Sequence, residues 1–179
     1  MKNSLIILLL ITISFKTQAQ KKITRTGEVT FHSETPMENI DAKNNQVASI
    51  FVINEKKVAF NVLMKSFKFD KALMEEHFNE KYVHSDTYPS AKFQGTISDD
   101  IELEKNKTYK DVIIDGEMTF HGVTKPLKVK ADIVVAEDLS IDLKANFPIN
   151  LEEYNVEVPA LVRDKIADEI MVSVATKYQ

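Results

Sequence analysis

Apolar and polar residues alternate with a period of two along much of this chain, and this feature constrains the fold most. The clearest run is residues 139–147, where the apolar positions are Leu139, Ile141, Leu143, Ala145 and Phe147. Residues 58–64, 93–97 and 166–176 alternate in the same way. A strand with this pattern packs one face against a core and exposes the other to water, as in antiparallel sheets.

The number and spacing of these segments indicate an all-β domain. Similar stretches lie near residues 26–32, 47–54, 110–120 and 126–135, which gives about eight strands in total. The connections are short, and no regular alternation of strands with helices calls for a parallel sheet. The pattern therefore favours a closed antiparallel barrel or a β-sandwich.

Two long segments depart from the strand pattern, and one hairpin turn can be recognised between strands. Apolar residues at helical spacing predict a short helix over residues 70–80, with Asp70 as its N-cap. Two prolines and mixed polarity in residues 148–164 predict a long ordered loop with a helical turn. Gly122 is expected to form the turn of a hairpin, because glycine adopts the backbone angles that tight turns require.

The first nineteen residues are predicted to be a signal peptide. A positive start at Lys2 precedes an apolar stretch over residues 5–15, and small residues stand at Thr17 and Ala19. Eleven residues fall short of the roughly 20 that a membrane span needs. Cleavage near Ala19 would leave one domain, residues 20–179, in the periplasm or outside the cell, with no stable membrane anchor.

The composition excludes several classes of protein. There is no cysteine, so disulfides, a thiolate nucleophile and a lipoprotein anchor are all excluded. The formal net charge is −4, and it becomes −6 if residues 1–19 are removed with Lys2 and Lys16. This charge provides no basic field for a nucleic-acid partner.

Two segments resemble the hallmark motifs of the YceI-like family. The first consists of ALMEEHFNEKY at residues 72–82 followed by SDTYPSAKF at residues 85–93. The second is GEMTFHGVTKP at residues 116–126. The resemblance implies an eight-stranded antiparallel lipocalin-like barrel, with the helix of residues 70–80 near one barrel end. It also implies an exported protein that carries a polyisoprenoid chain inside the barrel.

The expected function is therefore lipid binding rather than catalysis. The barrel would hold an isoprenoid, quinone or fatty-acid-like chain, as a carrier or in a stress response, with no metal, no catalytic residue and no cofactor besides the lipid. Phe and Met side chains suit such a ligand because they repack easily. The residues predicted to line the ligand are Phe60, Val62, Met64, Phe93, Met118 and Phe120. Those predicted at the mouth or lid are Met74, His77, Phe78 and His121.

Two alternatives remain open. A hydrolase or metal-dependent enzyme could use His77, His84 or His121, and a metal site formed by His77, Glu80 and His84 is conceivable. A structural barrel could instead be filled by its own side chains. A cavity of a few hundred Å³ would argue against a filled barrel, and a helix placed as a lid would favour lipid binding. The oligomeric state stays open, with a homodimer as one option.

Overall fold

The computed structural model describes residues 20–98 and 100–179, and most of them lie in β-strands. The predicted signal peptide falls on residues 1–19, which lie outside the described residues. Each of the eight predicted strand segments corresponds to one long strand. These strands are β1 (Lys21–Glu34), β2 (Asn39–Val52), β3 (Lys57–Leu63), β5 (Ser90–Ile97), β6 (Lys107–Phe120), β7 (Val123–Val135), β8 (Ile141–Asn150) and β9 (Glu169–Tyr178).

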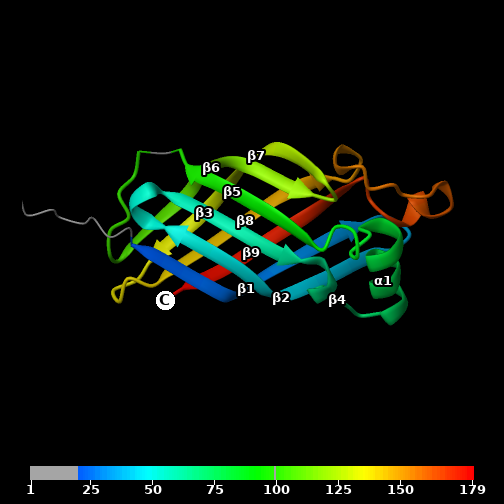
Figure 1. Cartoon of the computed structure of the whole chain (residues 1–179), viewed down its shortest axis with the longest axis horizontal. Helices are drawn as coiled ribbons and strands as arrows, with labels where there is room; N and C mark the ends of the chain where they lie inside the picture. The colour runs from blue at the N-terminus through cyan, green and yellow to red at the C-terminus, as the bar shows by residue number, and fades with distance from the viewer. Residues whose placement is uncertain (1–19, 99) are drawn as a thin grey trace, which may run out of the picture.

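The eight strands close into an antiparallel barrel, so the barrel prediction is confirmed and the sandwich alternative is wrong. Neighbouring strands pair in the order β1-β2-β3-β5-β6-β7-β8-β9, and β9 pairs with β1 to complete the ring. The two-residue strand β4 (Lys68–Phe69) adds to the first half of β2. Figure 1 shows the long strands crossing the molecule obliquely, with the helix α1 at one end.

The predicted helix of residues 70–80 is confirmed as a helical segment at one end of the barrel. It consists of α1 (Ala72–His77), followed directly by the π-helix η3 (Phe78–Tyr82). The prediction of Asp70 as its N-cap is wrong: Lys71 occupies that position with an extended backbone, and no side chain caps the helix. Within the described residues, no helix has both the length and the hydropathy needed to cross a membrane.

The predicted loop of residues 148–164 begins three residues too early, because β8 continues through Pro148 to Asn150. Beyond Ala145, β8 pairs with β9 alone, so a proline without an N–H group can be accommodated in the strand. The connection that follows contains two 3-10 helices, η4 (Glu152–Tyr154) and η5 (Ala160–Lys165). Two more 3-10 helices flank β3, namely η1 (Ile53–Glu55) and η2 (Met64–Ser66).

The β6–β7 hairpin has the turn that the sequence predicts. Phe120 pairs with Val123, so only His121 and Gly122 form the connection. Both have positive φ angles, of 48° and 78°, which is the geometry of a type I′ turn. The turn also packs against Tyr88, since a Cβ atom on Gly122 would lie 2.6 Å from the Cε1 atom of that ring.

The barrel is filled with side chains at the end where β1 begins and β9 ends. Tyr178 is fully buried there and packs edge-on against Phe51, with ring centroids 5.8 Å apart. The Tyr178 hydroxyl lies 2.6 Å from Ser49 Oγ, which donates to the carbonyl oxygen of Ala59. Burial raises the pKa of the Tyr178 hydroxyl, so it stays protonated and can donate to Ser49. Other fully or almost fully buried side chains that do not line the cavity described below are Val47, Ile133 and Ile141.

An ion pair on the outer surface makes the stability of the fold depend on pH. His32 Nδ1 on β1 lies 2.7 Å from Asp41 Oδ1 on β2, and this hydrogen bond is the main cause that raises the His32 pKa above 6.5. Because the folded pKa is the higher one, the stabilisation is complete below pH 6.5 and disappears as pH rises through the folded pKa. Both side chains are exposed, so we expect less than about 1 kcal/mol.

An NMR titration of His32 checks this expectation. The pKa should be higher in the wild type than in the Asp41→Asn variant, while Asp142→Asn on β8 serves as a control that leaves it unchanged. Equal values for the wild type and Asp41→Asn would contradict the assignment.

Candidate functional site

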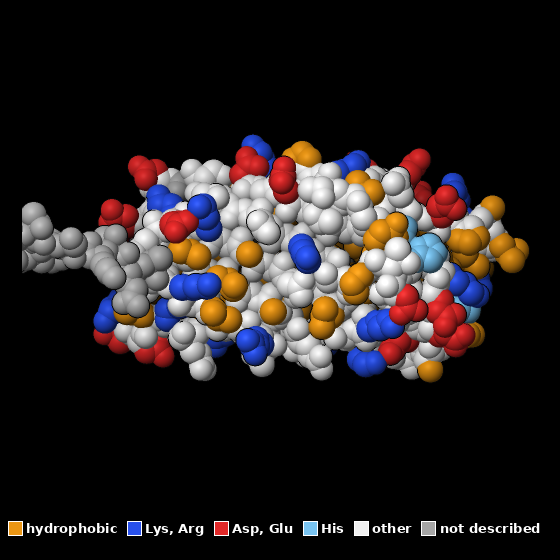
Figure 2. Space-filling view, in the orientation of Figure 1, with side chains coloured by type: hydrophobic (Ala, Val, Ile, Leu, Met, Phe, Trp, Pro, Cys, Tyr) orange, Lys and Arg blue, Asp and Glu red, His pale blue; other side chains and the backbone are white. Residues whose placement is uncertain are grey.

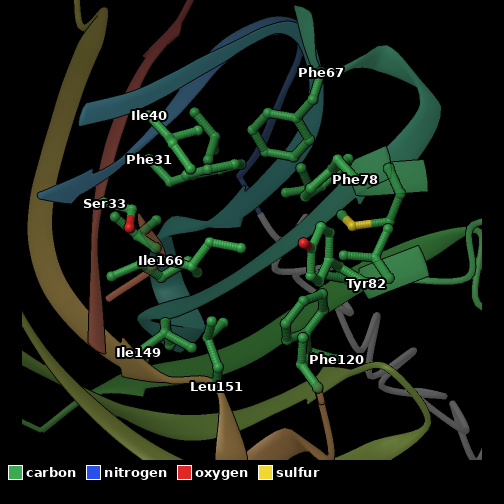
Figure 3. Close-up of a pocket in the computed structure, with 18 of the residues that line it drawn as sticks. Phe31, Ser33, Ile40, Phe67, Phe78, Tyr82, Phe120, Ile149, Leu151 and Ile166 are labelled. Atoms are coloured by element: carbon green, nitrogen blue, oxygen red, sulfur yellow. The ribbon is translucent and has the colours of Figure 1, made fainter. Parts of the chain in front are cut away.

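The other half of the barrel is hollow. It contains a cavity of about 510 Å³, and residues of α1, of η3 and of the connection between β8 and β9 line it at the barrel end. Residues of all eight barrel strands line its wall, and nearly all of them are apolar. Figure 3 shows the labelled side chains, among them Phe31, Phe120 and Leu151, converging on this space from several sides. A cavity of this size argues against the filled-barrel alternative.

All six side chains predicted to line a ligand lie in the wall of this cavity: Phe60, Val62, Met64, Phe93, Met118 and Phe120. The strand register explains why they meet. Phe60 on β3 is directly opposite Phe93 on β5, and Phe93 is directly opposite Met118 on β6. Residues opposite one another in a sheet point to the same face, so these three form a row inside the barrel. Contact with a ligand stays a prediction.

Three of the four predicted mouth residues also line the cavity, namely Met74, His77 and Phe78. Phe78 is held by aromatic contacts with Phe31, Phe67 and Phe69, at centroid distances of 5.6, 5.6 and 5.1 Å. Such contacts contribute about 0.5–1.5 kcal/mol each beyond the burial of their area. They fasten the helical segment to β1, to β4 and to Phe67 just before β4, so that it forms one side of the mouth.

His121 lies at the same end of the barrel, but not in the cavity wall. Its Nε2 atom is 2.9 Å from His84 Nδ1, and its Nδ1 atom is 3.1 Å from the carbonyl oxygen of Tyr154. Since a carbonyl oxygen only accepts, Nδ1 of His121 is the donor in that bond. The ring also packs edge-on against Tyr88, with centroids 4.6 Å apart. His121 therefore joins the two sequence motifs to the β8–β9 connection.

The enzymatic alternative gains no support from this geometry. His84 and His121 are absent from the wall of the cavity, whereas His77 is part of it. Across residues 20–98 and 100–179, no three His, Asp or Glu side chains are grouped so that they could hold a metal ion. The conceivable site of His77, Glu80 and His84 is therefore not formed.

The sequence pattern missed part of the wall. Phe31, Ser33 and Ile40 lie on β1 and β2, where the alternation of Val29, Phe31 and Ser33 could have revealed two of them. Further lining residues come from irregular segments, where apolar and polar residues do not alternate regularly: Phe67, Leu151, Val156, Val162 and Ile166.

Few polar side chains reach the cavity. Figure 3 shows the hydroxyls of Ser33 and Tyr82 among apolar groups. Ser33 Oγ accepts a hydrogen bond from the Ala167 N–H, whereas the Tyr82 hydroxyl has no partner in the described part of the chain. Burial raises the pKa of Tyr82 above 10, so the hydroxyl is a neutral donor. Lys71, which is paired with Glu38, and Lys165 stand at the mouth.

Comparisons with known proteins agree with this architecture. The chain is similar to a polyisoprenoid-binding domain from Saccharophagus degradans, described as implicated in plant cell wall breakdown, with a TM-score of 0.77, 11% identity and coverage of 90% of this chain and 99% of that one. It is also similar to BcnA from Burkholderia cenocepacia, with a TM-score of 0.68, 15% identity and coverage of 86% and 96%. A YceI protein from Campylobacter jejuni gives a TM-score of 0.61 at 14% identity, covering 77% and 84%. At these identities the likeness shows the fold alone.

Sequence comparison identifies the family. A curated relative, the UPF0312 protein plu2095 from Photorhabdus laumondii, is 27% identical over 109 residues, and this alignment spans 60% of the chain and 44% of the relative. The chain thus matches less than half the length of that relative. The family model of the YceI-like domain, in contrast, matches residues 14–178, which is nearly the whole chain. The chain belongs to the YceI-like family.

Proposed function

We propose that this protein binds one long apolar lipid chain in the hollow half of its barrel, as an isoprenoid, quinone or fatty-acid-like ligand. The observation that carries the proposal is the cavity of about 510 Å³, walled by Phe, Val, Ile, Leu and Met side chains. Burying a hydrocarbon chain there gains up to about 0.8 kcal/mol per CH₂ group. A structural similarity to a domain named as polyisoprenoid-binding supports the same class of ligand.

The volume of the cavity limits the length of the chain. At roughly 30 Å³ for a group the size of a water molecule, a cavity of about 510 Å³ holds on the order of 15 to 20 chain atoms. A longer chain would have to extend through the mouth beside α1. We therefore expect ligands of about this length, or longer ligands that are only partly enclosed.

The polar groups suggest where the head of the ligand lies. The Tyr82 hydroxyl is a donor without a partner among residues 20–98 and 100–179, and Lys165 stands at the mouth. A ligand oxygen can accept a hydrogen bond from the partly buried Tyr82 hydroxyl. The proposed ligand therefore has an apolar tail inside and an oxygen-bearing head at the mouth.

We further propose that the protein works as an exported carrier, in the periplasm or outside the cell. The sequence of residues 1–19 supports export. A carrier is needed in an aqueous compartment because free chains of this kind are poorly tolerated in water.

Identification of the bound ligand tests the proposal. The full-length gene is expressed in its own host, and the purified protein is studied by native mass spectrometry and organic extraction. We expect one stoichiometric chain, and a mass that lacks residues 1–19. Absence of bound lipid, together with no binding of added prenyl or acyl chains by the extracted protein, would refute lipid binding. Retention of residues 1–19 would refute export alone.

A further inference from the structure

Three apolar side chains protrude at the mouth of the barrel. Leu161 is 94% exposed, Met37 is 67% exposed and Leu73 is 60% exposed, and these are the three most exposed large hydrophobic residues in the described part of the chain. The next, Ile23, is 53% exposed and lies near the start of β1 at the other end of the barrel. Single exposed apolar residues are common on protein surfaces, but here the three largest exposures coincide at one place.

Each protruding residue stands beside a residue that lines the cavity. Met37 precedes Glu38 in the β1–β2 turn, Leu73 precedes Met74 in α1, and Leu161 precedes Val162 in η5. Figure 1 shows that α1, the β1–β2 turn and the β8–β9 connection occupy the same end of the molecule. The three residues, which we call the apolar tips, therefore surround the entrance to the cavity.

Local structure fixes the direction of two tips. Thr35 Oγ1 accepts hydrogen bonds from the N–H groups of Met37 and Glu38, which holds the turn so that Glu38 faces the cavity and Met37 faces solvent. In η5, the Val162 N–H donates to the carbonyl oxygen of Pro159 at 3.0 Å. Val162 then points inward, and its neighbour Leu161 points away. The exposure of the tips thus follows from the same geometry that builds the cavity wall.

The surroundings of the tips fit a lipid surface better than a protein partner. Figure 2 shows hydrophobic groups at this end separated by acidic and basic side chains, rather than one continuous apolar patch. Arg163, Asp164 and Lys165 begin two residues after Leu161, and Lys71 and Glu38, close in sequence to the other two tips, form an ion pair. Separate apolar tips among charges of both signs match a bilayer interface, where tips enter the acyl region and charged groups stay among the head groups.

We propose that the barrel docks on a lipid bilayer through Met37, Leu73 and Leu161, with its mouth facing the membrane. This inference rests on the proposed function, because the docked mouth would let an apolar chain pass between bilayer and cavity without crossing water. Insertion of apolar side chains dominates the interaction, so it should occur on neutral phosphatidylcholine vesicles and change little with salt.

Two measurements on tip variants test the docking. Leu161→Ser and Met37→Ser are made singly and together, since neither residue lines the cavity, whereas Leu73 does. Ile23→Ser, at the other end of the barrel, is the matched control. Proteins are produced from the full-length gene, and their N-termini are checked by mass so that all variants are compared with the same terminus. Flotation with phosphatidylcholine vesicles measures docking, and stopped-flow transfer of a fluorescent fatty acid from vesicles measures loading.

We expect each tip substitution to reduce vesicle binding about tenfold and to slow loading, because each apolar side chain contributes on the order of 1.4 kcal/mol on insertion. Ile23→Ser should match the wild type. Affinity for the same fatty acid in solution, without vesicles, should be unchanged in all variants. Wild-type-like flotation and loading by the double variant would overturn the docking, as would vesicle binding abolished by salt. If the wild type does not bind the fatty acid in solution, this result would instead count against the proposed function.

Discussion

Replacing Gly116 by Ala is expected to destabilise the barrel by more than about 3 kcal/mol. Gly116 on β6 is directly opposite Gly95 on β5, and the strands approach closely at this pair. A Cβ atom on Gly116 would lie 2.2 Å from the carbonyl oxygen of Gln94 and 2.6 Å from the Cα of Gly95. Both are backbone atoms, so the clash can be relieved only by separating β5 from β6, which weakens the backbone hydrogen bonds between them.

Thermal unfolding of a matched pair measures the effect. For a domain of this size, 3 kcal/mol lowers the Tm by roughly 6–12 °C. Gly95→Ala is the control: the three atoms nearest to its Cβ belong to side chains, Ile114 Cγ2 and the Phe93 ring, which can shift. We expect Gly95→Ala to lower the Tm much less. Similar Tm values for the two variants would contradict the close backbone approach of the two strands at Gly116.

The period-two alternation was sufficient to locate all eight barrel strands, because each has one buried and one exposed face. The choice between barrel and sandwich depends on whether β1 pairs with β9, and that contact joins residues about 140 positions apart. Alternation within a strand carries no information on such a partner. The close approach of the strands at Gly95 and Gly116 could not be predicted either, because it depends on these two glycines being opposite one another in the sheet.

The candidate site was predictable to the extent that it lies on strands. Phe60, Phe93 and Met118 line the cavity because their inward positions follow from alternation. Leu151 and Ile166 could not be found in this way, because they belong to an irregular connection. His121 was correctly placed at the hairpin, but its hydrogen bonds to His84 and Tyr154 depend on how that connection folds back.

Alternation also could not separate the hollow half of the barrel from the filled half. Val58 and Phe60 face inward on the same strand, yet only Phe60 lines the cavity. The difference arises from what lies across the barrel. Large side chains such as Phe51 and Tyr178 meet at one end, whereas Ala145 is one of the small residues facing the space at the other. The distribution of large and small inward-facing residues therefore decides which half of the barrel has room for a ligand.

Placing a large side chain at Ala145 is accordingly expected to shorten the chain that the cavity accepts. Ala145 is almost fully buried on β8 and lines the cavity between Leu143 and Phe147. The Ala145→Phe substitution adds a ring of six carbon atoms, which displaces about five or six chain groups. At up to about 0.8 kcal/mol per group, loss of these contacts should reduce the affinity for a chain of 15 to 20 atoms by at least about tenfold and by up to about 3,000-fold.

The decisive measurement is the affinity for a series of saturated acyl chains of increasing length. The wild type should bind more tightly up to about 15 to 20 chain atoms, and Ala145→Phe should stop gaining about five or six atoms earlier. The matched control is Asn146→Phe, which adds a phenyl ring to the next residue of β8, where the side chain is exposed to solvent. It should leave the profile unchanged. Because the new ring at Ala145 enters empty space, the Tm of the ligand-free protein should stay equal or rise. An unchanged length profile in a well-folded Ala145→Phe variant would mean that the chain does not occupy this cavity.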